Sequence, residues 1–357
     1  KSKEIVVGNE INFNIILEED VEALDEVVVV GYGNQKKLSV IGSVQTIEPT
    51  KLQVGSSRSM SNNLAGQLAG VIAVQPSGEP GYDNSNFWIR GIASFSGNTS
   101  PLVLVDGVER SLNDLDPAEI ESFSVLKDAS ASAMYGVRGA NGVIIINTKR
   151  GKEGEFNVNL DAYFGVQKAA KQLRMLNAQQ FGDMLWQAMK NDGKTPSHDV
   201  YGNGDQAVVP EYLDSNHLIP SDDVDWVDEI LRAAVVQSYN LSFTKADKKS
   251  NQLFSLGYYD QQGLVKFSDF KRVSGRFNSE YKLFDDHLRI GENISLSHSW
   301  GTSVSNNAAL GGTLYEAYKF QSITPVKNLE DEYAGNVFSD IPNPMGKLYR
   351  NKDNQDK

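Results

Sequence analysis

Residues 121–149 read ESFSVLKDASASAMYGVRGANGVIIINTK, and this stretch holds a candidate helix of small residues, a glycine-rich turn and an apolar strand in direct succession. Glycines at 136, 139 and 142 permit backbone conformations that a side chain would obstruct. The segment between Tyr135 and Val143 is therefore expected to be tightly folded or closely approached. The run Val143–Ile146 predicts a fully buried strand. No charged group here has the spacing of a catalytic set, so the stretch is interpreted as a packed structural element.

Other segments carry a family resemblance when they are taken in chain order. They are DEVVVVGYG (25–33), LAGQLAGVIAVQPSGEPG (64–81), WIRG (88–91) with PLVLVDGVE (101–109), VLKDASASAMYGVRGANGVIIINTKRG (125–151), DWVDEILRAAVVQSYNLSF (225–243) and SLGYYDQQGL (255–264). Together they resemble the SusC-like TonB-dependent outer-membrane transporters of Bacteroidetes, which import glycans or peptides. The resemblance implies an α/β plug domain followed by antiparallel strands of a large transmembrane β-barrel.

Composition narrows the class of protein. The chain has 357 residues, of which 40% are apolar, and this is enough for real hydrophobic cores. The longest purely apolar runs fall far short of the ~18–20 residues that a membrane helix requires. A net charge of −12 argues against a nucleic-acid partner. The chain has no cysteine, which rules out disulfides and thiolate metal sites. No cofactor is expected.

Residues 1–150 divide into three predicted parts. Residues 1–20 alternate between apolar and polar, and by the resemblance they are expected to end an N-terminal β-sandwich extension. Residues 21–33 are predicted to be an acidic linker followed by the TonB box described below. Residues 34–150 are predicted to be the plug, a small α/β domain. Its expected strands lie at 40–47, 70–75, 86–91, 102–106, 122–126 and 142–149.

After Gly151 the pattern changes to long alternating strands. Five are predicted, at 156–166, 236–245, 252–261, 271–283 and 288–300, each with one apolar and one polar face. A soluble antiparallel sheet would also show this alternation. Short turns near 246–250 and 285–287, set against long loops at the other end, favour an outer-membrane barrel. About 22 strands would close a plugged barrel, so residues 151–357 are expected to supply only its first strands, with 311–357 in an extracellular loop.

Two helices are predicted within the loops. Asn177 and Gln180 form a candidate capping box, and Phe181, Leu185 and Met189 follow on one face before a stop at Gly193. Asp225 and Asp228 mark the start of a second short helix. The acidic residues around them lack the spacing of a known calcium loop, so we interpret them as a solvated helix start.

The run Asp25, Glu26, Val27, Val28, Val29 and Val30 has two interpretations from its residues. A β-branched run after a flexible linker offers unpaired backbone groups for strand addition, although an ordinary sheet strand is an alternative. A dinucleotide-binding turn is a weak match, because Gly33 is not followed by a third glycine or a good helix start. The resemblance implies that this run is the TonB box, which pairs with TonB and its ExbB/ExbD complex.

Arg90 and Arg138 each precede a glycine within the otherwise apolar plug. One interpretation is that they are two surface arginines. The resemblance instead implies that they are latches, meaning arginines that face barrel carboxylates and help to hold the plug until TonB pulls. Glu280 is a candidate carboxylate partner. Glu292 alternates in step with Ile290 and Ile294, so its side chain is expected on the apolar face of its strand. A charge on that face requires either a shifted register or a position near a membrane interface.

Substrate contacts are expected from plug loops, and Tyr82, Asp83, Asn84, Phe95 and Asn98 combine aromatic surface with hydrogen-bonding groups. The resemblance implies an outer-membrane importer that contacts outer-membrane lipid, works with a SusD-like lipoprotein and has no enzymatic activity. Its substrate is expected to be an oligosaccharide or a peptide. A soluble β-rich glycan-binding or hydrolytic protein is the alternative.

Overall fold

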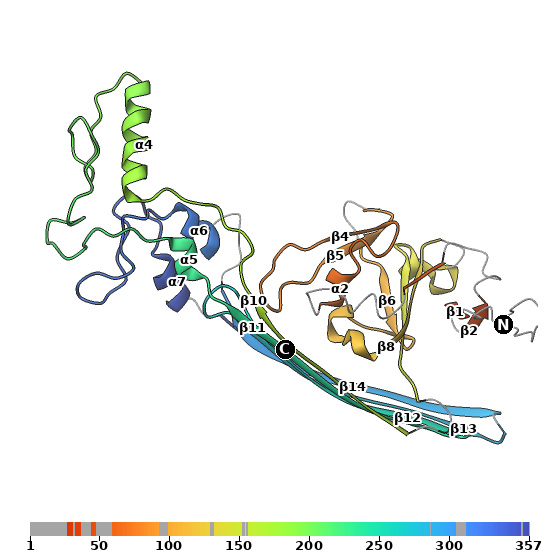
Figure 1. The fold of residues 1–357 in the computed structure, drawn as a ribbon. Coiled ribbons are helices and arrows are strands. Elements are labelled where there is room, and N and C mark those ends of the chain that lie inside the picture. The colour runs from red at the N-terminus through yellow and green to blue at the C-terminus, as the bar shows by residue number, and fades with distance from the viewer. Residues whose placement is uncertain are drawn as a thin grey trace, which may run out of the picture. The chain divides into compact units, whose positions relative to one another are not determined.

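A computed structural model describes residues 27–30, 33–36, 44–47, 59–92, 99–128, 132–151, 154, 156–285, 287–304, 312–350 and 353–356. These residues form two compact units (Figure 1). The first holds the chain up to Val74 together with residues 86–148, and the second holds residues 75–85 together with residues 149–357. The predicted extension, residues 1–20, lies outside the described residues. Residues 75–85 thus group with the long strands, although their sequence lies within the predicted plug.

A five-stranded mixed sheet of order β3-β8-β9-β6-β7 forms the first unit. Its strands are β3 (Val44–Ile47), β6 (Leu102–Val105), β7 (Val108–Glu109), β8 (Ile120–Leu126) and β9 (Val143–Thr148). β6 and β9 are parallel, whereas the other neighbouring pairs are antiparallel. A separate hairpin joins β4 (Val71–Val74) to β5 (Asn86–Ile89). The six strands predicted between 40 and 149 are confirmed wherever the structure describes them.

β9 is buried on both faces, as its apolar run predicts. Ile144 and Ile146 join one core with Phe123 of β8, and Val143 and Ile145 join the core on the opposite face. Successive side chains of a strand point to opposite faces, so four consecutive apolar residues supply both cores. The first core also takes the short helix α2 (Met60–Asn63). The remaining elements are 3-10 turns, η2 (Leu112–Asp114) and η3 (Pro117–Glu119).

The glycines before β9 are required by its packing. A Cβ on Gly142, whose φ is +91°, would lie 2.6 Å from Cδ1 of Ile89. A Cβ on Gly139 would lie 2.9 Å from the carbonyl oxygen of Ser132. The expected helix of small residues is instead a 3-10 segment, η4 (Ala133–Gly139), which is interrupted by the left-handed φ of 57° at Gly136. Tight folding around these glycines is confirmed.

The second unit contains a sheet of long antiparallel strands in the order of the chain (Figure 1). They are β10 (Phe156–Gln167), β11 (Ala234–Ala246), β12 (Ser250–Gln262), β13 (Asp269–Leu283) and β14 (Leu288–Ser303). All five were predicted, with the short turns at the predicted places. A sixth strand, β15 (Asp353–Asp356), pairs with the end of β14. The expectation that 311–357 form only a loop is wrong at this point.

The strand register sorts one face of this sheet into rows. Two adjacent rows are apolar, Phe243–Phe254–Phe277–Ile294 and Leu241–Leu256–Gly275–Leu296, and an aromatic row with Tyr239, Tyr258 and His298 follows. Mixed rows lie beyond these: Phe156–Lys245–Gln252–Ser279–Glu292 at one end and Phe164–Gln237–Asp260–Lys271–Trp300 at the other. Apolar residues therefore dominate the middle of this face, and charged and amide side chains gather toward its ends.

Glu292 lies in a row of mainly polar residues. The β13–β14 register runs without a shift and pairs Glu292 with Ser279, in the row that also holds Lys245 and Gln252. The shifted register is therefore excluded, and the position of this carboxylate near a membrane interface stays a prediction. No helix in the described part of the chain is both long and apolar enough to cross a bilayer.

The loops between the strands carry four helices at one end of the sheet (Figure 1). α4 (Ala178–Asn191) begins with the predicted capping box of Asn177 and Gln180 and ends before Gly193, whose φ is +69°. Its inner face packs on Tyr201, whose hydroxyl donates a 2.9 Å hydrogen bond to the carbonyl of Ala178. Burial, with a smaller contribution from Asp223, raises the pKa of Tyr201 to about 12. This phenol therefore remains a donor at any physiological pH.

The other three helices pack together as a second loop core. They are α5 (Trp226–Ile230), α6 (Thr313–Lys319) and α7 (Pro344–Arg350). Asp225 caps α5, as predicted, by accepting from the backbone N–H groups of Val227 and Asp228. A largely buried ion pair of 2.6 Å joins Glu316 of α6 to Lys347 of α7. The long loops of this unit thus have a folded structure of their own.

Replacing Gly182 of α4 by alanine should destabilise the packing of α4 on Tyr201 and Ala207. A Cβ there would lie 2.8 Å from the ring of Tyr201 and 2.9 Å from Cβ of Ala207, and such overpacking costs about 1–3 kcal/mol. Gly204 is the matched control, because its nearest neighbour would be 3.8 Å away. Hydrogen exchange across 178–191 should accelerate in Gly182→Ala and stay unchanged in Gly204→Ala. Equal exchange in both variants would contradict the packing described.

The β11–β12 turn should open in acid. The backbone N–H of Lys249 lowers the pKa of Asp247 most, followed by the hydroxyl and backbone N–H of Ser250. Since the folded pKa lies below the ordinary value, this carboxylate stabilises the turn above its ordinary pKa, and the contribution is lost as pH falls through the lowered pKa. Amide protection at Ser250 should fall in that window. In Asp247→Asn the protection should be weaker at neutral pH and independent of pH.

Candidate functional site

The predicted TonB box forms a strand where it is described. β1 (Val27–Val30) pairs antiparallel with β2 (Gly33–Lys36), and Val30 lies opposite Gly33. These strands form a two-stranded sheet, so within the described residues the outer edge of β1 has no neighbouring strand. The dinucleotide interpretation is wrong, because a strand and not a helix follows the glycines. Asp25 and Glu26 lie outside the described residues.

Arg90, at the end of β5, is fixed by a backbone hydrogen bond and by an ion pair. Its φ is +62°, a left-handed conformation that non-glycine residues rarely adopt, and its N–H donates a 2.8 Å hydrogen bond to the carbonyl of Gly70. Its guanidinium forms an ion pair with Asp128. Lys127, beside this pair, donates to the carbonyl of Ala69. Burial and then the charge of Arg90 lower the pKa of Lys127, while Asp128 opposes them.

The second predicted latch and its candidate partner have other contacts. Arg138 lies 3.4 Å from Glu109, and both side chains are exposed. Glu280 of β13 is bridged at 2.8 Å by Arg150, which follows the plug sequence directly. Exposed pairs of this kind contribute little stability. The roles of Arg90 and Arg138 as latches stay predictions.

Three of the predicted substrate residues lie on the plug-derived segment 75–85. Tyr82 donates its N–H to the carbonyl of Glu79 and is 39% exposed. The carbonyl of Asp83 accepts from the side chain of Gln75 at 3.1 Å. Asn84 is half-buried beside them. Phe95 and Asn98 lie outside the described residues.

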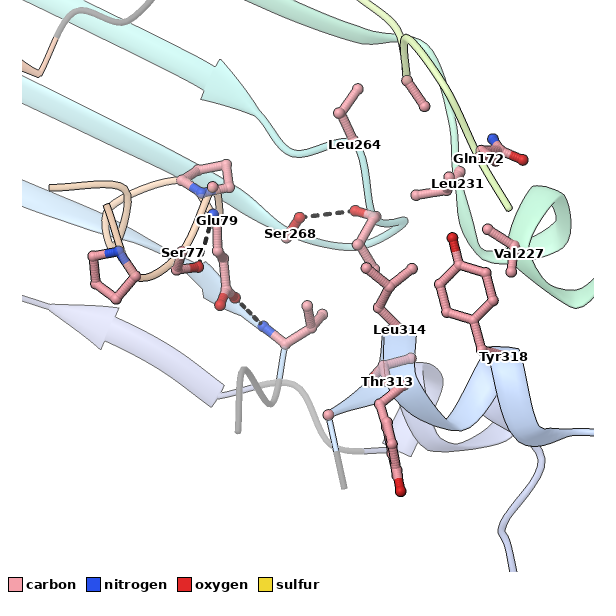
Figure 2. Close-up of a pocket in the computed structure, with 18 of the residues that line it drawn as sticks. Ser77, Glu79, Gln172, Val227, Leu231, Leu264, Ser268, Thr313, Leu314 and Tyr318 are labelled. Atoms are coloured by element: carbon pink, nitrogen blue, oxygen red, sulfur yellow. Dashed lines mark hydrogen bonds between the residues drawn. The ribbon is translucent and has the colours of Figure 1, made fainter. Parts of the chain in front are cut away.

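Glu79 fixes the same segment to the end of β14. Its Oε1 accepts the backbone N–H of Val304 at 2.7 Å (Figure 2). The same oxygen accepts the hydroxyl of Ser303 at 2.9 Å. Its own N–H donates to Oγ of Ser77 at 3.0 Å. Two residues on, the backbone of Gly81 lies so near Phe270 of β13 that a Cβ would be 2.6 Å from the ring. One carboxylate and one close approach therefore hold this segment to the strand ends.

A pocket of about 610 Å³ opens beside this segment (Figure 2). Its lining comes from segment 76–80, residues 169–172, α5, the β12–β13 turn, the end of β14 and α6. The apolar side chains among them are Pro76, Pro80, Val227, Leu231, Leu264, Val265, Val304, Leu314, Tyr315 and Tyr318. The volume falls within the ~300–1,000 Å³ range of small-ligand sites.

Several polar residues that could have served catalysis or metal binding have structural roles instead. Ser124, which begins a Ser-x-x-Lys pattern with Lys127, is buried within β8. Asp223 accepts the N–H of Ala178 at the start of α4, just as Asp225 caps α5. No group of three or more metal-ligating side chains occurs within the described residues.

Sequence reasoning missed Glu79 and the pocket. Its partners, Ser303 and Val304, lie more than two hundred positions further along the chain, so no local pattern could reveal them. The signal that was available is the glutamate within Pro76-Ser-Gly-Glu-Pro80-Gly, a charge in a rigid turn-forming segment.

Comparison with known proteins gives consistent matches. Residues 36–143 match the TonB-dependent Receptor Plug Domain family. TonB-dependent receptor SusC of Bacteroides thetaiotaomicron is 33% identical over 93% of this chain and 32% of its own length. TonB-dependent receptor P3 of Formosa agariphila is 30% identical over 96% of this chain and 32% of its own length. The chain thus spans about a third of the length of these relatives.

A solved structure resembles the chain as well. The RagAB peptide importer in its open-open state matches with a TM-score of 0.72 and 28% identity, over 89% of this chain and 38% of that one. The matched part of the chain covers both the plug sheet and the long strands, so the α/β plug is followed by part of a barrel.

Replacing Glu79 by alanine should release segment 75–85 from the end of β14. The substitution leaves the N–H of Val304 without its acceptor, which costs ~1–3 kcal/mol locally. Exchange of the Val304 amide should therefore accelerate, as measured by hydrogen exchange of the receptor in detergent. Glu79→Gln, which keeps one acceptor oxygen, should show a smaller change. Unchanged exchange in Glu79→Ala would contradict the anchoring role.

Proposed function

Because the chain belongs to the SusC/RagA-like TonB-dependent receptors, we propose that its protein imports oligosaccharides or peptides across the outer membrane with energy from the TonB system. The observation that carries this proposal is that one chain contains both a plug sheet and a sheet of long antiparallel strands. The plug sheet is followed by long antiparallel strands with an exposed apolar face. This combination has the parts of a gated pore and needs no covalent chemistry.

The proposed site of energy coupling is residues 25–30. TonB would add a strand to the outer edge of β1, using backbone hydrogen bonds that do not depend on side-chain identity. The two-stranded arrangement supports this, since strand addition requires an edge with unpaired N–H and C=O groups. ExbB and ExbD would supply the force through TonB.

The proposed substrate contacts include Tyr82, Asp83 and Asn84, on the segment that Glu79 holds at the end of β14. Phe95 and Asn98, which lie outside the described residues, are proposed as further contacts. A SusD-like surface lipoprotein would close over the long-loop end of the sheet as a lid, a partner that the relationship to SusC and RagAB suggests. Location in the outer membrane follows from the same family relationship.

Arg90 and Arg138 are proposed to hold the plug until TonB pulls. Both guanidinium groups remain more than half exposed although each is paired, with side-chain exposures of 55% and 72%. An exposed guanidinium can exchange one carboxylate partner for another at little cost. This supports a role as a releasable latch.

A soluble glycan-binding or hydrolytic protein is disfavoured by the sheet itself. Side chains such as Leu160, Phe164 and Leu296 are 65%, 65% and 72% exposed on one face. A soluble protein rarely leaves a continuous apolar face of this extent uncovered.

Uptake should depend on the backbone of β1. Val30 and Gly33 form the hydrogen-bonded pair that closes the β1–β2 turn, so the N–H of Val28 faces β2 and that of Val29 faces the outer edge. Val29→Pro removes this edge donor, so uptake of a radiolabelled substrate should be abolished while substrate binding to whole cells is retained. Deletion of residues 25–30 should act in the same way. Val29→Ile keeps both the donor and the β-branched shape, and it should transport normally. Normal uptake by the proline variant or the deletion would refute the coupling mechanism.

A further inference from the structure

The pocket lies at the end of the sheet from which a substrate would arrive. Every lining segment outside 76–80 lies just beyond a strand end: 169–172 after β10, α5 before β11, the β12–β13 turn, and the residues after β14. The two short turns, near Asp247 and Asp285, lie at the opposite end of the same strands. Short turns are periplasmic in outer-membrane barrels, so the pocket is on the outer side.

The walls of the pocket are fixed in place before any ligand binds. Arg232 holds the β12–β13 turn through hydrogen bonds from Nε to the carbonyl of Gly263 at 3.1 Å and from Nη2 to the carbonyl of Ser268 at 2.8 Å. Glu79 holds the opposite wall on the end of β14. A preformed pocket loses little conformational entropy when a ligand enters.

Three polar side chains of the lining are used by the walls themselves. Ser77 accepts from the N–H of Glu79, the Ser268 hydroxyl donates to the carbonyl of Val265 at 2.8 Å (Figure 2), and Glu79 is engaged as described above. Thr313 is 2% exposed, and its Oγ1 has no hydrogen-bond partner among the residues that the structure describes. The other polar groups of the lining are Lys171, Gln172 and the hydroxyls of Tyr315 and Tyr318. Apolar side chains outnumber these groups, so the pocket presents a mainly apolar surface.

These features discriminate between the two proposed substrate classes. A sugar has a hydroxyl on most of its carbons, and each hydroxyl that is buried without a partner costs ~1–3 kcal/mol. An aliphatic or aromatic side chain gains ~1.5–3 kcal/mol from the same burial. Lys171 also lines the pocket and can face a carboxylate of the ligand. A peptide with an apolar residue fits this mainly apolar lining better than an oligosaccharide does.

We infer that this pocket is a subsite for an apolar side chain of a peptide substrate, with Lys171 facing a peptide carboxylate. Leu314 and Tyr315 of α6 lie at its edge, 45% and 40% exposed. This inference rests on the proposed import function and narrows its substrate to peptides.

Binding of defined peptides to the receptor in detergent tests the inference. The probes are heptapeptides of glycine and serine with a single central Leu, Phe or Asp, together with maltoheptaose. The Leu and Phe peptides should bind at least about tenfold more tightly than the Asp peptide, and also more tightly than maltoheptaose. Leu314→Glu should remove this preference. Leu329→Glu, an exposed leucine outside the lining, is the matched control and should keep it. Equal affinity for all peptides, or equal effects of the two variants, would overturn the inference.

A labelling experiment locates the bound peptide. The chain contains no cysteine, so Leu314→Cys and Leu329→Cys introduce single reactive thiols into it. The Leu peptide should slow maleimide labelling of Leu314→Cys and leave that of Leu329→Cys unchanged. Absence of protection at position 314 would overturn the inference even if the peptide binds.

Uptake by cells separates this inference from the function on which it rests. TonB-dependent uptake of maltoheptaose without uptake of the peptides would refute the peptide subsite and leave the import function standing. Uptake of neither class, or uptake that is unaffected by deletion of residues 25–30, would refute both. TonB-dependent uptake of the Leu peptide that Leu314→Glu reduces and Leu329→Glu does not would support both.

Discussion

The unbroken antiparallel register from β10 to β14 is the constraint on which the rest of the second unit depends. Backbone groups inside a bilayer have no water to bond, so each strand must satisfy its neighbours along its whole length. Because side chains alternate, the same register gathers apolar residues into rows on one face. A slip of one residue would turn Leu256 and Ile294 away from the lipid. The register also gathers Glu292, Ser279 and Gln252 into one row.

The plug unit obeys a different constraint, which is the burial of β9 on both faces. Four consecutive apolar residues can be buried only if something packs on each side, and the two cores provide this. The close approach of Ile89 to Gly142 leaves no space for a side chain at the turn into the strand. The glycines that stand out in the sequence therefore serve packing, and the chemistry of the protein lies elsewhere.

Residues 75–85 connect these two kinds of structure. They belong to the plug by sequence, yet the carboxylate of Glu79 holds them on the end of β14. The same segment forms one wall of the apolar pocket and carries Tyr82, Asp83 and Asn84. A ligand in the pocket would thus contact a segment that continues directly into β4 and β5 of the plug. Substrate occupancy at the outer side and the state of the plug can be linked through this short covalent connection.

The sequence alone determined the elements whose signals are local. Alternation over ten or more residues predicted the five long strands, and Asn177 with Gln180 predicted the start of α4, because both patterns arise from neighbours in the chain. The tertiary structure alone decided which charged groups meet. Glu79 bonds to Ser303 and Glu280 to Arg150 across more than a hundred positions, and no period in the sequence encodes such a distance. The pocket belongs to this second class, since six separated segments must converge before it exists.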